Sequence, residues 1–265
     1  MHPIERLRYV ARASGAGQEI LVQETASALG AFDGDPMGMV TACRRIVGRH
    51  PGSGPLWWLC GRVLTATDPM REAWAAADEL SEDDTPRQLA HHLPADAVVC
   101  VVGWPELVAE GLVRRGDLEV RHVDPQGEGI GLARTLLESD VDVVDVPAGG
   151  IGPAAATADL VVLEASVVGP EAFLAPAGSL PLAAVARHAG VDVWLAVGVG
   201  RLVPQRVWEA VVRPVETSDD PWEADAELVG LDLVDRVVDP CGLETVADAL
   251  RRTDCPIAPE LFKEL

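Results

Sequence analysis

Positive charge is scarce in this chain of 265 residues. Lysine and arginine together number 21 against 42 aspartate and glutamate residues, which gives a formal net charge of −21. Lys263 is the single lysine. A chain with this balance repels nucleic-acid phosphates and anionic lipid head groups unless a local basic patch intervenes, and the sequence has no such patch. We therefore expect no direct binding to nucleic acid or to a membrane.

Long apolar runs are also lacking. No stretch approaches the roughly 18 apolar residues that span a bilayer, and the first residues, Met-His-Pro-Ile-Glu-Arg, lack the apolar region of a signal peptide. Five cysteines are spread along the chain, at Cys43, Cys60, Cys100, Cys241 and Cys255. Their wide spacing argues against a disulfide framework or a zinc site. We expect a cytoplasmic protein with reduced thiols, no metal and no cofactor.

Short β-branched runs alternate with segments rich in alanine, glycine and leucine through the second part of the chain. The runs lie at residues 97–102, 118–123, 141–146, 160–163, 191–197 and 231–238. Strands that alternate with helices of about ten residues predict βαβ units and a parallel sheet buried on both faces. We predict a Rossmann-like α/β fold for residues 94–265. Such sheets bind ligands beyond the carboxyl ends of their strands, so we expect the functional site there.

The first part of the chain is predicted to be helical. Residues 4–92 carry apolar side chains at helical spacing, with a turn-rich break at 49–55. We therefore predict an N-terminal helical domain over residues 1–93. Trp57 and Trp58 are expected to pack between this helical layer and the sheet, because tryptophan buries a large area.

The order of segments in the second part resembles a known family. Residues 158–169 read Ala-Asp-Leu-Val-Val-Leu-Glu-Ala-Ser-Val-Val-Gly, and residues 173–179 read Phe-Leu-Ala-Pro-Ala-Gly-Ser. Upstream, residues 124–133 read Asp-Pro-Gln-Gly-Glu-Gly-Ile-Gly-Leu-Ala. A strand and a closing turn follow at residues 233–242. This order resembles the alpha, beta and delta subunits of initiation factor 2B and two related isomerases, which act on methylthioribose 1-phosphate and ribose 1,5-bisphosphate.

The resemblance implies a cytoplasmic homo-oligomer, with a homodimer expected, that binds a phosphorylated sugar or a nucleotide. It also shows changes at the family's proton-transferring positions. The family's Gly-Ala-Asp corresponds to Glu-Ala-Ser here, so Ser166 stands where the family has its acid. The family's Asn-Lys-Ile-Gly-Thr corresponds to residues 175–179, which contain no lysine. Its Cys-Asn-(Thr/Ser)-Gly segment falls near residues 101–104, which contain no cysteine.

Two glycine-containing pairs are candidates for a ligand pocket. Gln126 could hydrogen-bond a hydroxyl or phosphate through its amide, with Gly127 beside it at a helix start; a helix cap explains this pair equally well. Gly149 and Gly150 follow a strand, and their amides could cradle a phosphate. A tight strand-to-helix turn explains these two glycines more simply.

Further candidates come from another helix start and from the helical layer. Gly178 and Ser179 begin a helix, where serine is a good cap and the amides can face an anion. Arg49 is a candidate phosphate partner through its guanidinium group. The predicted ligand-binding set is Arg49, Gln126, Gly127, Gly149, Gly150, Ser166, Gly178 and Ser179.

Three functions follow as hypotheses. The first is a catalytically degenerate initiation factor 2B-like protein that binds a sugar phosphate or nucleotide in a regulatory or assembly role. The second is a sugar-phosphate isomerase in which Glu164 and Asp124 supply the acid and base, although Glu164 as a loop residue and Asp124 as a turn former are simpler interpretations. The third is an interaction scaffold without a ligand, with its pocket closed by Pro176.

Overall fold

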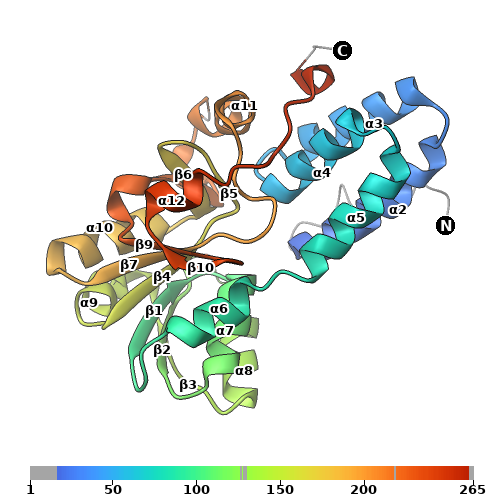
Figure 1. Ribbon diagram of the computed structural model, residues 1–265. Helices are drawn as coiled ribbons and strands as arrows, with labels where there is room; N and C mark the ends of the chain where they lie inside the picture. The colour runs from blue at the N-terminus through green and yellow to red at the C-terminus, as the bar shows by residue number, and fades with distance from the viewer. Residues whose placement is uncertain (1–16, 126, 128–129, 218, 263–265) are drawn as a thin grey trace.

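The chain folds into a helical layer and a larger α/β part (Figure 1). The structure is a computed structural model that describes residues 17–125, 127, 130–217 and 219–262. The helical layer contains α2 (Gln18–Leu29), the 3₁₀ turn η1 (Gly30–Phe32), α3 (Pro36–Arg49), α4 (Gly54–Thr65) and α5 (Pro69–Ser81). The helices predicted between residues 18 and 92 are therefore confirmed, and the prediction for residues 4–16 lies outside the described residues.

Local sequence explains where three of these helices begin. The side chains of Asp35, Ser53 and Asp68 each accept a hydrogen bond from a backbone N–H in the first turn of α3, α4 and α5. Each of these helices also has a proline in its first two positions, where the missing N–H costs no hydrogen bond.

The main sheet has seven strands in the order β10-β9-β7-β4-β1-β2-β3. Its strands are β1 (Val98–Val102), β2 (Glu119–Val123), β3 (Asp142–Val146), β4 (Leu160–Glu164), β7 (Asp192–Ala196), β9 (Arg236–Asp239) and β10 (Gly242–Glu244). Every pair is parallel except β9 with β10. The parallel strands thus follow the Rossmann order, with a switch point between β1 and β4. The predicted fold class is confirmed.

Helices cover both faces of this sheet (Figure 1). One face carries α6 (Thr85–His92), α7 (Glu106–Arg115) and α8 (Ile130–Glu138). The other carries α9 (Ile151–Ala156), which follows the 3₁₀ turn η2 (Ala148–Gly150), with α10 (Ser179–Ala189) and α12 (Val246–Leu250). Strand β1 shows why both faces are apolar: Val99 and Val101 enter one core, whereas Cys100 and Val102 enter the other.

A second sheet, which the sequence did not predict, contains three antiparallel strands. They are β5 (Val167–Val168), β6 (Ala172–Pro176) and β8 (Ala226–Gly230). Helix α11 (Gln205–Glu216) and the 3₁₀ turn η3 (Pro221–Glu223) lie between β7 and β8 in sequence. The strand predicted at residues 231–238 is partly wrong, because η4 (Leu231–Leu233) forms a 3₁₀ turn there. This turn leads the chain from the small sheet to β9, since one continuous strand cannot serve both sheets.

The helical layer shares its apolar core with distant segments. Residues of α2 to α5 pack in one cluster with β5, β6, α11 and the C-terminal segment, which ends in η5 (Pro259–Phe262). Trp58 is fully buried against Gly200, and Trp57 stacks on Phe262 with ring centroids 5.9 Å apart. The expectation that these tryptophans pack against the sheet is therefore only partly confirmed, because Trp58 meets the loop after β7 and Trp57 meets the C-terminal segment. Within the described ranges, no helix is long and apolar enough to cross a bilayer.

Candidate functional site

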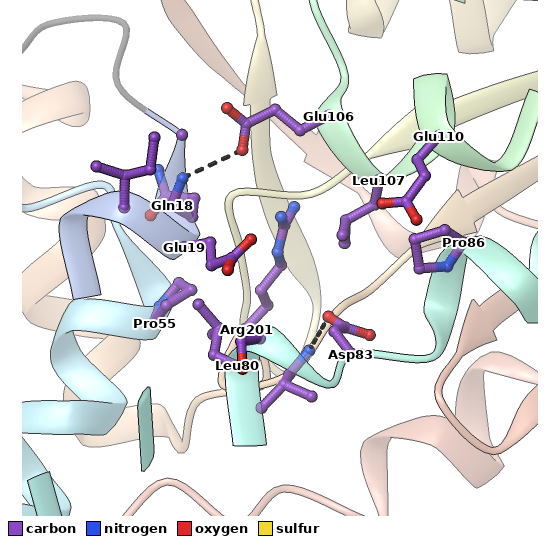
Figure 2. A pocket seen from close by; sticks show the side chains of 14 residues that line it. Gln18, Glu19, Pro55, Leu80, Asp83, Pro86, Glu106, Leu107, Glu110 and Arg201 are labelled. Carbon is purple, nitrogen blue, oxygen red and sulfur yellow. Dashed lines mark hydrogen bonds between the residues drawn. The ribbon is translucent and has the colours of Figure 1, made fainter. Parts of the chain in front are cut away.

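A cavity of about 280 Å³ lies where the helical layer meets the carboxyl edge of the main sheet (Figure 2). The helical layer contributes residues of α2, Pro55 of α4 and Leu80 of α5. The α/β part contributes the first turns of α7, which follows β1, and the loop after β7. The cavity therefore occupies the side of a Rossmann sheet on which ligands bind.

A buried ion pair between Arg201, which lines the cavity, and Glu164 lies beside it. The Arg201 Nη1 atom donates to Glu164 Oε1 at 2.8 Å and to the Ala165 carbonyl at 2.5 Å. The side chains of Arg201 and Glu164 are only 5% and 9% exposed. The second oxygen of Glu164 accepts a hydrogen bond from the Val108 amide at 3.1 Å. Glu164 is thus committed to structure, and removal of one partner from a buried pair costs about 3–5 kcal/mol.

Two glycines place Arg201 in the cavity wall. Gly200 has a φ of +72° and lies against the Trp58 ring, so a side chain there would be strained and would collide with the ring. A side chain at Gly198 would collide with Asp83 and Leu107. Between them, the Val199 amide donates to Asp83 Oδ2 at 2.8 Å. The Gly-Val-Gly-Arg sequence is therefore a fixed turn that directs the guanidinium group.

Four carboxylates line the cavity: Glu19, Asp83, Glu106 and Glu110 (Figure 2). Glu106, on α7, contacts the start of α2. Its Oε2 atom accepts a hydrogen bond from the Gln18 amide at 3.1 Å. Burial raises the pKa of Glu106, the hydrogen bond from Gln18 and the charge of Arg201 oppose the rise, and the carboxylates of Glu164 and Glu19 add to it.

The other carboxylates have defined partners. Asp83 accepts hydrogen bonds from the Thr85 amide at 2.9 Å and from Val199. Glu110 pairs with Arg114 at 2.7 Å at a half-exposed position, where such pairs are weak. Since Arg201 is already balanced by Glu164, the lining carries an excess of negative charge. The remaining wall is apolar and includes Ile20, Pro55, Leu80, Pro86 and Leu107.

Among the residues that the structure describes, no three histidine, cysteine, aspartate or glutamate side chains are placed to hold a metal. The described lining of the cavity mixes charged and apolar side chains.

The predicted ligand-binding residues lie elsewhere. None of the described ones lines this cavity, and Gln126 lies outside the described residues. Arg49 ends α3 and is exposed. Gly127 is exposed, and its amide donates to Asp124 Oδ1 at 2.8 Å, as expected of a turn. Ser166 is half-buried, and its backbone carbonyl accepts from the Gly54 amide at 3.1 Å.

Gly149 and Gly150 form part of η2, and Gly149 is exposed. Neither glycine has a positive φ, and the following helix α9 has only 6 residues. The structure gives these glycines the geometry of a strand-to-helix turn. At the family's cysteine segment, a side chain at Gly103 would meet the Pro176 ring at 3.4 Å, so Pro176 does pack over that loop.

The start of α10 differs from the sequence prediction. The cap of this helix is Gly178, with a φ of +99°, and the Ser179 hydroxyl instead donates to the Pro176 carbonyl at 2.7 Å. The prediction of a serine cap is wrong because this tight turn draws the hydroxyl back to residue 176. The amides of Gly178 and Leu180 both donate to Glu227 Oε1, at 2.7 and 2.8 Å. A carboxylate of the chain itself therefore occupies the amides expected to face an anion.

Sequence reasoning missed the residues that line the cavity. A usable signal was present for two of them: Glu106 follows β1 after a short Gly-Trp-Pro link, and Arg201 follows β7 after Gly-Val-Gly. Both positions lie at the carboxyl edge of the sheet. Glu19 and Asp83 gave no such signal, because they come from the helical part and meet the sheet only in the folded chain.

Comparisons with known proteins place the fold. No protein-family model matches the chain, and no curated protein matches its sequence. Among solved structures, translation initiation factor eIF-2B from Pyrococcus horikoshii OT3 is similar with a TM-score of 0.78 and 14% identity, covering 94% of this chain and 98% of that one. The eIF2B beta subunit from Chaetomium thermophilum is similar with a TM-score of 0.73 and 16% identity, covering 99% and 93%.

A tetrameric eIF2B-beta2-delta2 complex from C. thermophilum also contains a similar chain, with a TM-score of 0.74, 16% identity and coverage of 94% and 92%. The similarity extends over nearly the whole chain in each case. The resemblance that the sequence suggested is confirmed at the level of the fold.

Proposed function

We propose that this chain, which has the fold of the initiation factor 2B subunits, acts as a non-catalytic protein that binds a small ligand in a regulatory or assembly role. The observation that carries the proposal is the buried pair of Glu164 with Arg201. Glu164 was one of two candidates for a replacement acid or base, with Asp124, and both oxygens of Glu164 accept hydrogen bonds from the protein. A carboxylate held in this way is poorly placed to move substrate protons.

The assembly part of the proposal rests on the fold. One similar structure is described as a tetrameric beta2-delta2 complex, and we propose that this chain likewise forms a homo-oligomer. The ligand part rests on the cavity of about 280 Å³, whose walls come from both parts of the chain. A ligand there would contact the helical layer and the sheet together.

A ligand-free scaffold is the second candidate, and two observations favour it. Pro176 covers Gly103, and Glu227 fills the amides at the start of α10. The second closes a helix start that was predicted to face a ligand, and the first packs on the loop that corresponds to the family's cysteine segment. The scaffold hypothesis leaves the cavity between the helical layer and the main sheet without a ligand. A measurement of ligand binding therefore separates the two proposals.

The proposal is tested by an isomerase assay together with a mass measurement. We expect purified chain to leave ribose 1,5-bisphosphate and methylthioribose 1-phosphate unconverted in a phosphorus NMR time course. Sedimentation should give the mass of two or more chains, whereas the mass of one chain would contradict the proposed oligomer.

Turnover that disappears in Glu164→Gln but persists in Glu138→Gln would contradict the non-catalytic proposal. Glu138 lies on the exposed end of α8 and makes a surface pair with Arg134. Because Glu164 also supports the fold, the thermal midpoint and circular dichroism spectrum of Glu164→Gln must be measured alongside its activity.

A further inference from the structure

We propose that His122 is a proton-sensitive link between the edge strand of the main sheet and the loop that leads to the cavity. When the imidazole ring takes up a proton, it ties β3 to the segment that follows β1. When the ring is neutral, the tie to β3 is absent. The inference concerns one buried side chain, so it does not depend on whether the cavity binds a ligand.

His122 lies near the carboxyl end of β2, between two other strands. In the parallel register it stands opposite Val101 of β1 and Asp145 of β3. Its side chain is only 1% exposed. Because water does not reach the ring, its two nitrogens depend on the protein for hydrogen bonds.

One ring nitrogen has such a partner. The Nε2 atom lies 2.8 Å from the carbonyl oxygen of Gly103. A carbonyl oxygen can only accept, so Nε2 carries a hydrogen and donates it. In the neutral ring the other nitrogen, Nδ1, is therefore an acceptor.

The charge state of the ring decides what Nδ1 can do. Among the described residues Nδ1 has no hydrogen-bond partner, and Oδ1 of Asp145 lies 3.7 Å away. In the neutral ring these two acceptors face each other, and neither supplies a hydrogen. A proton on Nδ1 makes it a donor to the carboxylate, and both ring nitrogens then have a partner. The Asp145 side chain is 75% exposed, so little packing opposes the small movement that closes the distance.

Other charged groups on β2 and just beyond it are directed elsewhere. Glu119 and Arg121 project from the opposite face of β2 and pair with each other at 3.2 Å. Asp124 accepts a hydrogen bond from the Gly127 amide.

The two helices on the His122 side of the sheet direct apolar residues toward it. These residues are Val108, Ala109 and Leu112 of α7 and Leu132 and Leu136 of α8. The charged side chains of both helices have other contacts: Glu106 with the Gln18 amide, Glu110 with Arg114, Arg115 with Asp117, and Arg134 with Glu138. Asp145 is thus the acidic group that a protonated His122 meets.

The two partners of His122 belong to parts of the fold with different freedom. Strand β3 is the last strand at one end of the main sheet (Figure 1) and pairs with β2 alone, so it opens more easily than a central strand. Gly103 belongs to the link from β1 to α7, whose first turn carries Glu106 in the cavity wall. The tie between them is present at acidic pH and is lost as pH rises through about 5–8, where imidazole ordinarily changes its charge.

The test is hydrogen–deuterium exchange of the full chain, read by mass spectrometry at pH 5.5 and pH 7.5. Exchange rates are divided by the intrinsic rate at each pH to give protection factors for the amides of β3. Asp145→Ala removes the proposed partner. Asp142→Ala is the matched control, because Asp142 is also exposed on β3 but projects from the opposite face. Strand β7, in the middle of the sheet, reports any general effect of pH on the fold.

We expect protection of β3 in the unmutated chain to be about threefold higher at pH 5.5 than at pH 7.5, with a smaller change in β7. Asp142→Ala should keep this difference, and Asp145→Ala should lose it. Equal protection of β3 at both pH values in the unmutated chain would overturn the inference. A difference that persists in Asp145→Ala, or that both variants lose equally, would also overturn it, because the effect would then come from the general charge of the chain.

Discussion

At the scale of single residues, the described lining of the cavity combines the carboxylates of Glu19, Asp83, Glu106 and Glu110 with the guanidinium group of Arg201. Glu106 lies among the carboxylates of Glu164 and Glu19 and the guanidinium group of Arg201, and desolvation raises its pKa more than the other contacts change it. Perturbed titratable groups in a cleft are typical of binding and catalytic sites, where stability is given up for function. The pair of Arg201 with Glu164 is different, because each charge there has its opposite within 2.8 Å.

The first prediction concerns the pH dependence of stability at Glu106. Its pKa in the folded chain is raised above the ordinary value of 4.5, mainly by burial. The native state therefore holds this proton more tightly than the unfolded state, and stability falls as pH rises through the raised pKa. Above that pH the full cost of burying the carboxylate is present, and below about 4.5 it is absent.

Glu106→Gln should consequently raise the thermal midpoint at pH 7 and lose this advantage near pH 4. The amide oxygen of glutamine can still accept the hydrogen bond from Gln18, so the structural contact is kept. Scanning calorimetry of both proteins between pH 4 and 8 measures the difference. A midpoint difference that does not change with pH would contradict the assigned burial effect.

At the scale of secondary-structure elements, α10 is stabilised at its start by a side chain from another sheet. Glu227 lies on β8, paired with Ala175 of β6, and reaches the amides of Gly178 and Leu180. A carboxylate at a helix start satisfies free N–H groups and interacts favourably with the helix dipole. The small sheet thus fixes the position of a helix that covers the large one.

The second prediction is that Glu227→Ala lowers stability by about 1–2 kcal/mol, the usual cost of losing a cap and its charge. Inorganic phosphate should then restore part of the lost stability, because the freed amide N–H groups can donate hydrogen bonds to a bound anion. Urea unfolding with and without phosphate, at constant ionic strength, measures both effects. Glu171 is exposed and lies between β5 and β6, so Glu171→Ala offers a matched control.

If phosphate stabilises the unmutated chain as much as it stabilises the Glu227→Ala variant, the carboxylate does not block these amides. If phosphate does not restore any of the stability that Glu227→Ala loses, that result also counts against the anion-site interpretation. The stability loss alone would then reflect the cap.

At the scale of the whole molecule, the helical layer and the α/β part share one apolar cluster. Trp58 of α4 is fully buried in it, together with Val207 and Val211 of α11 and Leu261 near the C-terminus. The predicted boundary between residues 93 and 94 remains a prediction about folding units. A shared core favours unfolding of both parts together.

The third prediction follows from that core. Far-UV circular dichroism and tryptophan fluorescence should report one coincident thermal transition for the intact chain. Trp58→Ala should cost about 3–5 kcal/mol, which lowers the midpoint by roughly 6–20 °C at 2–4 °C per kcal/mol. Trp222→Ala should leave it nearly unchanged, since that side chain is 75% exposed. Two separated transitions would instead identify the helical layer as an independent domain.

Much of the fold could be predicted because its signals are local. Proline and capping residues mark the starts of α3, α4 and α5, and β-branched runs mark six strands of the main sheet. The small sheet was missed because β5 has only 2 residues and β6 and β8 are linked across more than 40 intervening positions. Strand pairing over that distance leaves no periodic signal between the partners.

Cysteine spacing shows the same limit in another part of the chain. The sequence separates Cys43, Cys60 and Cys255 widely, yet the Cys60 thiol hydrogen-bonds with Cys43 and lies near Cys255 in the helical core. All five cysteines are free. Contact with Cys43 and burial raise the pKa of Cys60, and burial raises that of Cys100 to about 12, so these thiols stay protonated.

The sequence by itself determined the Rossmann-like class, the helical first part and the resemblance to initiation factor 2B subunits. Those conclusions depend on residue order and periodicity, which need no knowledge of distant contacts. The tertiary structure alone decided the site, because its groups come from separated segments: Asp83 and Val199 are 116 positions apart, and Glu164 and Arg201 are 37 apart. Contact between these segments then set the partners of each group, and such contacts exist only in the folded chain.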